Sequence, residues 1–147
     1  MIEIRYVRSE DKEFWYRLDK HLPEKEFENK VACQRGYVLL DDSEPIGLLR
    51  YSLFWDNTPF CTLLFVDWKY QGKGYGKAAL KLLIARLFCE YQCNTIYLSL
   101  YQQNKHAYHL YTSFGFQENG EKDVNGETVM CLQKNHESVR QLNEISG

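Results

Sequence analysis

The sequence predicts an α/β (α+β) domain in which a mixed, mostly antiparallel central sheet carries helices on both faces. Three observations lead to this fold class. The predicted elements run as a strand, two helices, a meander of strands, a helix, a strand, a helix and a final strand pair. The length of 147 residues suits one domain that can bury a sizeable core. A hydrophobic content of 44%, with 15% aromatic residues, is typical of a globular chain.

The first elements are a strand followed by two helices. Residues 2–8 alternate in polarity and are rich in strand formers, which predicts an early or edge strand. A helix is expected over residues 10–22, and Pro23 stops it. A second short helix is expected over residues 24–35, with Gly36 as its end.

The middle of the chain predicts a meander and then a longer helix. Three strands are expected over residues 37–41, 46–55 and 60–68, separated by the turn sequences DDSEP and DNTP. The helix is expected over Lys77–Tyr91, with one apolar side. That side is formed by Leu80, Leu83, Ile84, Leu87 and Phe88.

The last elements are a strand, a helix and a strand pair. Residues 95–101 predict the strand, and residues 104–115 predict the helix, with an Asn cap and a terminal Gly. The segments 116–119 and 127–134 are expected to pair, because Asn125-Gly126 is a hairpin signal.

We expect one domain over residues 1–134 and a polar tail over 135–147. Within the tail, Val139, Leu142 and Ile145 would permit a weak helix, and a disordered end fits equally well. The final strands and the tail could also form a homodimer contact. No apolar stretch reaches membrane-spanning length, and the first residues lack the apolar core of a signal peptide. The expected location is therefore cytoplasmic, with no membrane partner.

Charge and cysteine content narrow the function classes further. The formal charge is -2, from 18 basic and 20 acidic side chains, so there is no electrostatic case for a nucleic-acid partner. The 5 cysteines are odd in number and include no CxxC pair. We expect them to be buried, reduced thiols, and we expect no metal site.

The segment Gln71–Lys77, QGKGYGK, connects a predicted strand to a predicted helix. The first turn of a helix has N–H groups without partners and carries a partial positive charge. Glycines let a phosphate oxygen approach these groups, and Lys73 and Lys77 add positive charge. The segment therefore predicts a phosphate or pyrophosphate site, the alternative being a plain tight turn.

Two common phosphate-binding motifs do not fit. A P-loop requires Gly where this chain has Gln71, and Ser or Thr where it has Ala78. Gly74, Gly76 and Ala79 do satisfy the dinucleotide pattern G-x-G-x-x-A. However, the next strand, TIYLSLYQQ, supplies no acid for a ribose, and the preceding strand belongs to a meander.

Two blocks resemble the GNAT family of N-acetyltransferases. In the first block, Gln71, Gly74 and Gly76 match the family pattern of Gln or Arg, two residues, Gly, one residue, and Gly or Ala. The second block, NKHAYHLYTSFGF, matches through Asn104 and Tyr111 and closes with Gly-Phe. The resemblance extends from about Ile2 to Leu132. The chain departs from the pattern at Trp68, where the family often has Pro.

The resemblance implies a GNAT-like acyl-CoA N-acyltransferase fold with acetyl-CoA as cofactor. Backbone N–H groups of residues 72–77 would hold the pyrophosphate. The strand before the loop would splay from its neighbour, so that the pantetheine pairs with its edge. An N–H near Val66 would stabilise the oxyanion. The implied cofactor-binding residues are Leu64, Phe65, Val66, Gln71, Gly72, Lys73, Gly74, Tyr75, Gly76, Lys77 and Asn104.

The resemblance assigns Tyr111 as the general acid. A phenol of pKa near 10 is protonated at neutral pH and can donate to a thiolate of pKa roughly 8.5. Packing in the core is the alternative role of Tyr111, and a plain helix cap is the alternative role of Asn104.

The general base stays open. Relatives that modify protein N-termini have a Glu five residues before the Asn, where this chain has Ser99. The alternatives are Asp67, Asp56, His106 and His109, or a water chain to bulk solvent.

The expected reaction is transfer of an acetyl group to a primary amine of a small molecule or peptide, by direct attack in a ternary complex. The alternatives are a non-catalytic acyl-CoA-binding sensor or interaction module and, less favoured, O-acyl transfer. Aromatics beside an acid would suit a cationic acceptor. The acceptor candidates are Phe27, Tyr37, Tyr51, Phe54, Trp55, Asp56 and Tyr101. For most of them, filling the core between sheet and helices is the alternative role.

Overall fold

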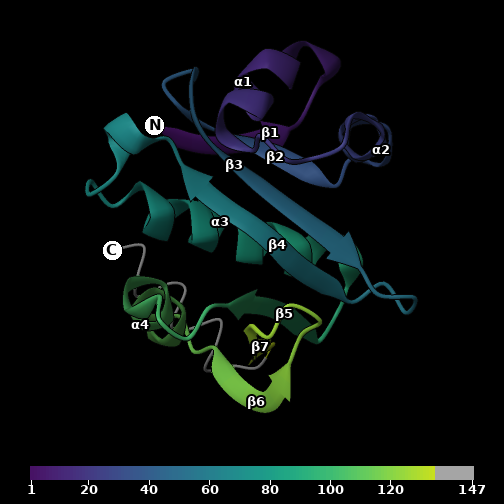
Figure 1. The fold of residues 1–147 in the computed structure, drawn as a ribbon, viewed down its shortest axis with the longest axis vertical. Coiled ribbons are helices and arrows are strands. Elements are labelled where there is room, and N and C mark those ends of the chain that lie inside the picture. The colour runs from purple at the N-terminus through teal and green to yellow at the C-terminus, as the bar shows by residue number, and fades with distance from the viewer. Residues whose placement is uncertain (135–147) are drawn as a thin grey trace. The chain divides into compact units, whose positions relative to one another are not determined.

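A computed structural model describes residues 1–134 (Figure 1). The predicted tail, with Val139, Leu142 and Ile145, lies outside the described residues. The strands form one 7-stranded sheet in the order β1-β2-β3-β4-β5-β7-β6. The pair β4–β5 is parallel, whereas β1–β2, β2–β3, β5–β7 and β6–β7 are antiparallel. The predicted mixed, mostly antiparallel sheet is thus confirmed.

The strands are β1 (Ile2–Tyr6), β2 (Gly36–Asp41), β3 (Glu44–Leu53), β4 (Pro59–Val66), β5 (Thr95–Leu100), β6 (Gln117–Lys122) and β7 (Thr128–Gln133). The helices are α1 (Lys12–Leu18), α2 (Glu24–Cys33), α3 (Tyr75–Tyr91) and α4 (Lys105–Ser113). Two short 3-10 turns, η1 (Ser9–Asp11) and η2 (Trp68–Tyr70), precede α1 and the glycine loop.

The chain forms two compact units. Unit 1 consists of Met1–Ser52 and Thr62–Leu83. Unit 2 consists of Leu53–Cys61 and the chain from Ile84 onward. The single domain expected over residues 1–134 stays a prediction.

A cluster of buried apolar side chains forms the core of unit 1. Trp15 is fully buried, and its ring meets the Phe27 ring edge-on at 5.9 Å. The indole N–H of Trp15 donates to Asp19 at 3.1 Å, so the one polar atom of this ring is satisfied. The cluster comprises Val7, Trp15, Leu22, Phe27, Val38, Leu40 and Leu48, with Leu63 packed against it.

Two helix ends in unit 1 differ from the sequence prediction. The first α-helix ends at Leu18 rather than at residue 22. The second ends at Cys33, and Gln34 is the left-handed residue after it, with φ of +56°. Gly36 was the wrong terminator, because it already belongs to β2, where it pairs with Arg50.

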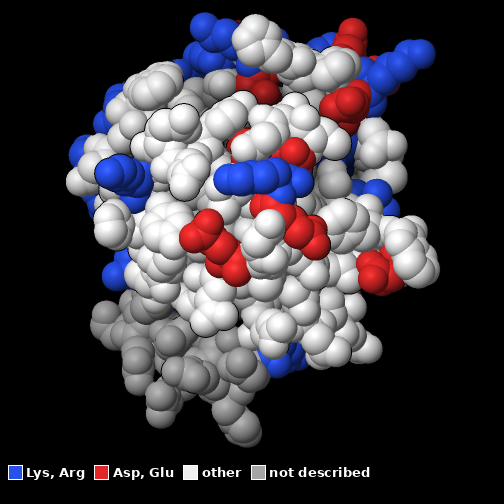
Figure 2. Space-filling model, turned by 60° about the horizontal axis from the view of Figure 1, so that its bottom comes forward, with Lys and Arg blue, Asp and Glu red and all other residues white. Residues whose placement is uncertain are grey.

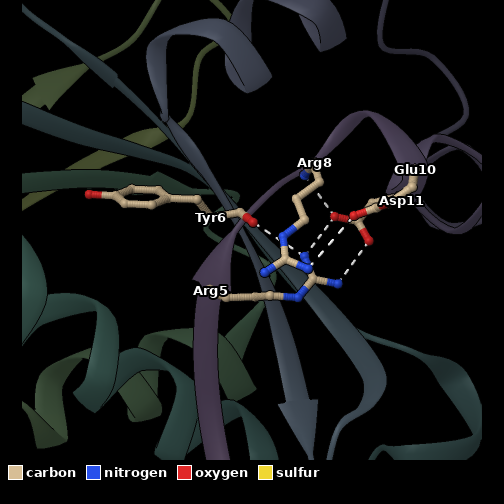
Figure 3. A network of polar contacts seen from close by, with 5 residues as sticks. All are labelled: Arg5, Tyr6, Arg8, Glu10 and Asp11. Atoms are coloured by element: carbon tan, nitrogen blue, oxygen red, sulfur yellow. Dashed lines mark hydrogen bonds and ion pairs between the residues drawn. The ribbon is translucent and has the colours of Figure 1, made fainter.

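Asp11 joins the end of β1 to the start of α1 (Figure 3). Its carboxylate accepts two hydrogen bonds from the Arg5 guanidinium, at 2.8 and 2.9 Å, and one from the Arg8 backbone N–H at 2.7 Å. Burial alone would raise the pKa of Asp11, but these hydrogen bonds outweigh it and hold the pKa below its usual value.

Unit 2 contains an antiparallel arrangement in which β7 pairs with both β5 and β6. The pairing of β6 with β7 shifts register between Glu118 and Lys122. As a result, β6 extends to Lys122, beyond the predicted segment 116–119. The predicted hairpin turn is confirmed: Asp123 N–H donates to the Glu127 carbonyl at 3.0 Å, and Gly126 has φ of +79°.

All five cysteines are free thiols, as expected. Their predicted burial holds for Cys61 but is wrong for Cys33 and Cys89, which are exposed. Within residues 1–134, His, Cys, Asp and Glu side chains form no group of three or more that could hold a metal ion. None of the helices described in this range is both long enough and apolar enough to cross a membrane.

We expect Asp11→Asn to lower the free energy of unfolding at pH 7 by about 2 kcal/mol, the usual cost of losing hydrogen bonds between charged groups. The pKa of Asp11 is lowered in the folded state. Its contribution is therefore complete above the unfolded-state pKa and disappears as pH falls through the folded-state pKa. Urea unfolding across this pH range measures the difference, which should shrink in acid. A constant difference would contradict the role of the ion pair.

Candidate functional site

The glycine loop of unit 1 has a backbone that requires glycine at two positions. Gly72 and Gly74 have φ of +81° and +84°, in the left-handed region that other residues rarely adopt. Gly76 has no such φ, and a Cβ added there would meet no protein atom within 4 Å. Neither backbone conformation nor protein packing therefore requires glycine at Gly76. The space beside Gly76 is therefore open to a ligand.

Three side-chain hydrogen bonds hold the loop within unit 1. The Gln71 amide donates to the Val66 carbonyl at 2.8 Å and so connects the loop to the end of β4. The Tyr70 hydroxyl donates to Glu44 at 2.8 Å, and the Tyr75 hydroxyl donates to Asp41 at 2.6 Å. These hydrogen bonds to carboxylates raise the pKa of both phenols. Both tyrosines thus remain donors, and the loop is fixed before any ligand binds.

The loop offers several groups that attract an anion. The α3 helix begins at Tyr75, so the N–H groups of its first turn are directed toward the loop. Lys73 and Lys77 are exposed, and the Lys73 ammonium lies 5.9 Å from the centre of the Tyr70 ring. Open backbone donors, a helix N-terminus and two lysines together can hold a phosphate or pyrophosphate.

The end of β4 lies close against Gly47 of β3. A Cβ on Gly47 would come within 2.6 Å of the Phe65 carbonyl oxygen and 3.3 Å of the Val66 Cα, which leaves no room for a side chain. Leu64, Phe65 and Val66, the predicted pantetheine-binding residues, are half-buried. Trp68, at the position where the family often has Pro, packs edge-on against Phe65 at 5.2 Å.

In the parallel pairing of β4 with β5, Phe60 lies opposite Tyr97 and Cys61 lies opposite Leu98. The predicted cofactor edge, Leu64–Val66, comes after these pairs along β4. The splaying of this edge from its neighbour stays a prediction, as does pairing with pantetheine.

Asn104 is the N-cap of α4 and Tyr111 lies within this helix. Both residues belong to unit 2. The Asn104 side-chain oxygen accepts the Ala107 N–H at 3.1 Å, so the capping role is the one observed. Tyr111 packs against Phe116, with ring centres 6.0 Å apart. Burial, together with the nearby Cys61 and Glu127, raises the pKa of Tyr111 to about 12. The phenol is thus a hydrogen-bond donor throughout the physiological range, and a weaker proton donor than a phenol in water.

Each of the four candidate bases has a local environment that accounts for its presence without a catalytic role. Asp67 is buried, at 2% exposure, and forms an ion pair with Arg17 at 2.8 Å. Asp56 accepts the Thr58 N–H at 3.0 Å, and its hydrogen bonds to Thr58 lower its pKa. His106 and His109 are exposed residues of α4.

Sequence reasoning missed two carboxyl groups in unit 2. Asp123 and Glu127 lie close enough to influence each other's ionisation, and Ser99 helps to lower the pKa of Asp123. The sequence analysis places Asp123 in the hairpin turn and Glu127 in the last strand, and gives neither a role in the site. The missing signal was the pairing of β5 with β7, because Ser99 pairs with Val129 and so lies beside the strand that Glu127 precedes.

The aromatic acceptor candidates divide into two groups. Phe27, Tyr37 and Tyr51 are buried, at 3%, 0% and 0% exposure, so their prediction as acceptor contacts was wrong. Tyr37 and Tyr51 stack on each other within the core of unit 1, at 5.9 Å. The exposed candidates are Phe54, Trp55, Asp56 and Tyr101.

Unit 2 contains a cavity of about 900 Å³ in which aromatic rings and acids occur together. Phe54 meets Phe60 and Tyr97 edge-on, with ring centres 5.6 and 5.7 Å apart, and these three rings line the cavity. Asp56 and Asp123 line it as well. This combination of rings and carboxylates suits a cationic ligand. On the face turned forward in Figure 2, acidic side chains surround a basic one near the middle.

Comparison with known proteins gives matches in both sequence and structure. The model of the acetyltransferase (GNAT) family matches residues 4–116. A spermine/spermidine N(1)-acetyltransferase of Bacillus subtilis (strain 168) is 58% identical over 66 residues, and a probable spermine N(1)-acetyltransferase of B. subtilis subsp. natto is equally similar. Each match spans 45% of this chain and 43% of the relative, so it covers less than half of either protein.

Solved structures match most of the chain. The spermidine/spermine N-acetyltransferase SpeG from Vibrio cholerae aligns with a TM-score of 0.77 at 21% identity, over 98% of this chain and 96% of that one. A V. cholerae spermidine N-acetyltransferase in complex with CoA and spermine gives 0.75 at 20% identity, over 90% and 95%. The PaiA N-acetyltransferase from Thermoplasma acidophilum, in complex with coenzyme A, gives 0.66 at 18%, over 91% and 99%. These likenesses establish the fold, and with the family match over residues 4–116 they show that the chain belongs to the acetyltransferase (GNAT) family.

Proposed function

We propose that this protein transfers an acetyl group from acetyl-CoA to a primary amine, by direct attack in a ternary complex. The observation that carries the proposal is the glycine loop, in which Gly76 leaves space that neither the backbone nor the packing requires. A pyrophosphate is the part of acetyl-CoA that fits a helix N-terminus flanked by Lys73 and Lys77.

The proposed acceptor is a polyamine such as spermine or spermidine. The identity of 58% with a spermine/spermidine N(1)-acetyltransferase supports this class, although it covers only 66 residues. The cavity of unit 2 gives independent support, because Phe54, Phe60 and Tyr97 can make cation–π contacts while Asp56 and Asp123 supply negative charge. A chain that carries several ammonium groups could contact the aromatic rings and the carboxylates at the same time.

The reaction requires a polarised thioester, a neutral amine and a stabilised leaving thiolate. In the proposed mechanism a backbone N–H near Val66 binds the developing oxyanion, a kind of contact typically worth about 3–4 kcal/mol. Tyr111 donates a hydrogen bond to the thiolate. Because its pKa is raised to about 12, this hydrogen bond, rather than complete proton transfer, is its main contribution.

Calorimetry with acetyl-CoA, together with thiol release against spermine, spermidine, diamines, amino acids and peptides, tests the proposed function. We expect binding, and release with the polyamines. Gly74→Asp should abolish binding, because it adds bulk and negative charge at the proposed pyrophosphate site. Gly120→Asp is the matched control, since Gly120 has the same φ of +84° and an equally open surrounding. Equal losses in the two variants would contradict the site. Binding without release across the panel would favour a non-catalytic acyl-CoA-binding module.

Tyr111→Phe should lower kcat by about 100-fold, the lower end of the range for acid–base groups, while acetyl-CoA affinity stays unchanged. The substitution removes only the hydroxyl and keeps the ring that packs on Phe116. Tyr108→Phe on the same helix is the control, because the Tyr108 hydroxyl donates to the exposed Glu118 at 3.0 Å. An unchanged kcat in Tyr111→Phe would mean that Tyr111 serves packing alone.

A further inference from the structure

The β6–β7 turn holds two carboxyl groups in a fixed arrangement. Asp123 accepts the N–H groups of Asn125 and Glu127, both at 2.9 Å, and its own N–H donates to the Glu127 carbonyl at 3.0 Å. The carboxyl groups of Asp123 and Glu127 lie close enough to influence each other's ionisation. Two neighbouring carboxylates repel each other, which favours uptake of a proton by one of them.

The same pair lies beside the residue at which the sequence lacks a base. The β5–β7 register pairs Ser99 with Val129 and Leu100 with Thr128, which places Glu127, the residue before β7, next to the end of β5. Ser99 also helps to lower the pKa of Asp123. A carboxyl pair therefore occurs next to Ser99, supplied by the adjacent hairpin.

Glu127 also has an electrostatic influence on the proposed acid. Its charge is the smallest of the three causes that raise the pKa of Tyr111, after burial and Cys61. Glu127 is half-buried, whereas Asp123 also lines the aromatic and acidic cavity. A proton taken by the pair thus has a route to solvent through that cavity.

We propose that Glu127 is the general base of the acetyl transfer and that Asp123 is its positioning residue. This inference rests on the proposed function. The Glu127 carboxylate takes a proton from the ammonium group of the acceptor. The neutral amine then forms the C–N bond to the thioester carbon, and the C–S bond breaks. The nitrogen loses a second proton to the leaving thiolate. Ammonium and thioester thus give amide, thiol and one proton, which Glu127 returns to solvent.

The surroundings of Glu127 make its carboxylate a stronger base than a solvated one. Burial raises the pKa of Glu127, and the charge and hydrogen bond of Asp123 raise it further. Burial would also raise the pKa of Asp123, but hydrogen bonds from the Glu127 backbone and Ser99 lower it overall. Nearby ionisable groups on other elements are Tyr111, Cys61 and Lys122, whose ammonium donates to the Thr128 hydroxyl at 2.8 Å.

The test is the pH dependence of kcat/KM in variants of the pair. Glu127→Gln should lower kcat by about 100-fold with unchanged acetyl-CoA affinity. Asp123→Asn keeps an oxygen for the turn N–H groups but removes the charge that raises the Glu127 pKa. It should therefore move the acidic limb of kcat/KM to lower pH. The acceptor amine loses its own proton over the same pH range in every variant, so this ionisation does not affect the comparison between variants. Glu118→Gln, an equal charge change on β6, should leave the profile unchanged.

An NMR titration of the Glu127 side-chain carboxyl provides a readout that does not need activity. We expect its midpoint to lie above that of a solvated Glu and to fall in Asp123→Asn. An active wild type with an unaltered profile in Glu127→Gln, or a Glu127 carboxyl that titrates normally, would overturn the base assignment alone. A wild type that neither binds acetyl-CoA nor releases thiol would instead overturn the proposed function, and the base role with it.

Discussion

The hydrogen bond from the Gln71 amide to the Val66 carbonyl is the contact on which the candidate cofactor site depends most. It connects the end of β4 to the loop that precedes α3, so the strand edge and the helix N-terminus of unit 1 are held in one arrangement. Gly47 makes this arrangement possible, because any side chain there would collide with the Phe65 carbonyl. The hydrogen bonds from Tyr75 to Asp41 and from Tyr70 to Glu44 attach the loop to the paired ends of β2 and β3.

Preorganisation of this kind matters because the ligand chemistry is electrostatic. Backbone N–H groups at a helix N-terminus stabilise an anion only if they already point to one place. The proton transfer proposed for unit 2 would use the same principle. The N–H groups of Asn125 and Glu127 hold the Asp123 carboxylate in the hairpin turn, and burial raises the pKa of Tyr111 to about 12. Each unit therefore contains groups fixed by local structure before any substrate arrives.

Local sequence signals predicted the features that depend on local physics. The glycines at 72 and 74 have the positive φ that a tight turn requires, Asn104 caps α4, and Asn125-Gly126 forms a hairpin turn. The apolar side of α3 was also predicted, since Leu80, Leu83, Ile84, Leu87 and Phe88 are all buried. Predictions that depend on partners distant in sequence were less accurate. Tyr37 and Tyr51 are core residues because of sheet packing, and Asp67 is buried and paired with Arg17, 50 residues away in sequence. The carboxyl groups beside Ser99 could not be recognised until the pairing of β5 with β7 was known.

The measurement that tests the central claim most directly compares acetyl-CoA with S-acetylpantetheine, which carries the thioester but no pyrophosphate. Backbone amide chemical shifts of residues 72–77 would be followed while each ligand is added. The account predicts large shifts of these amides with acetyl-CoA and small ones with S-acetylpantetheine, because the loop binds the pyrophosphate. Equal shifts with both ligands, or none with acetyl-CoA, would contradict it.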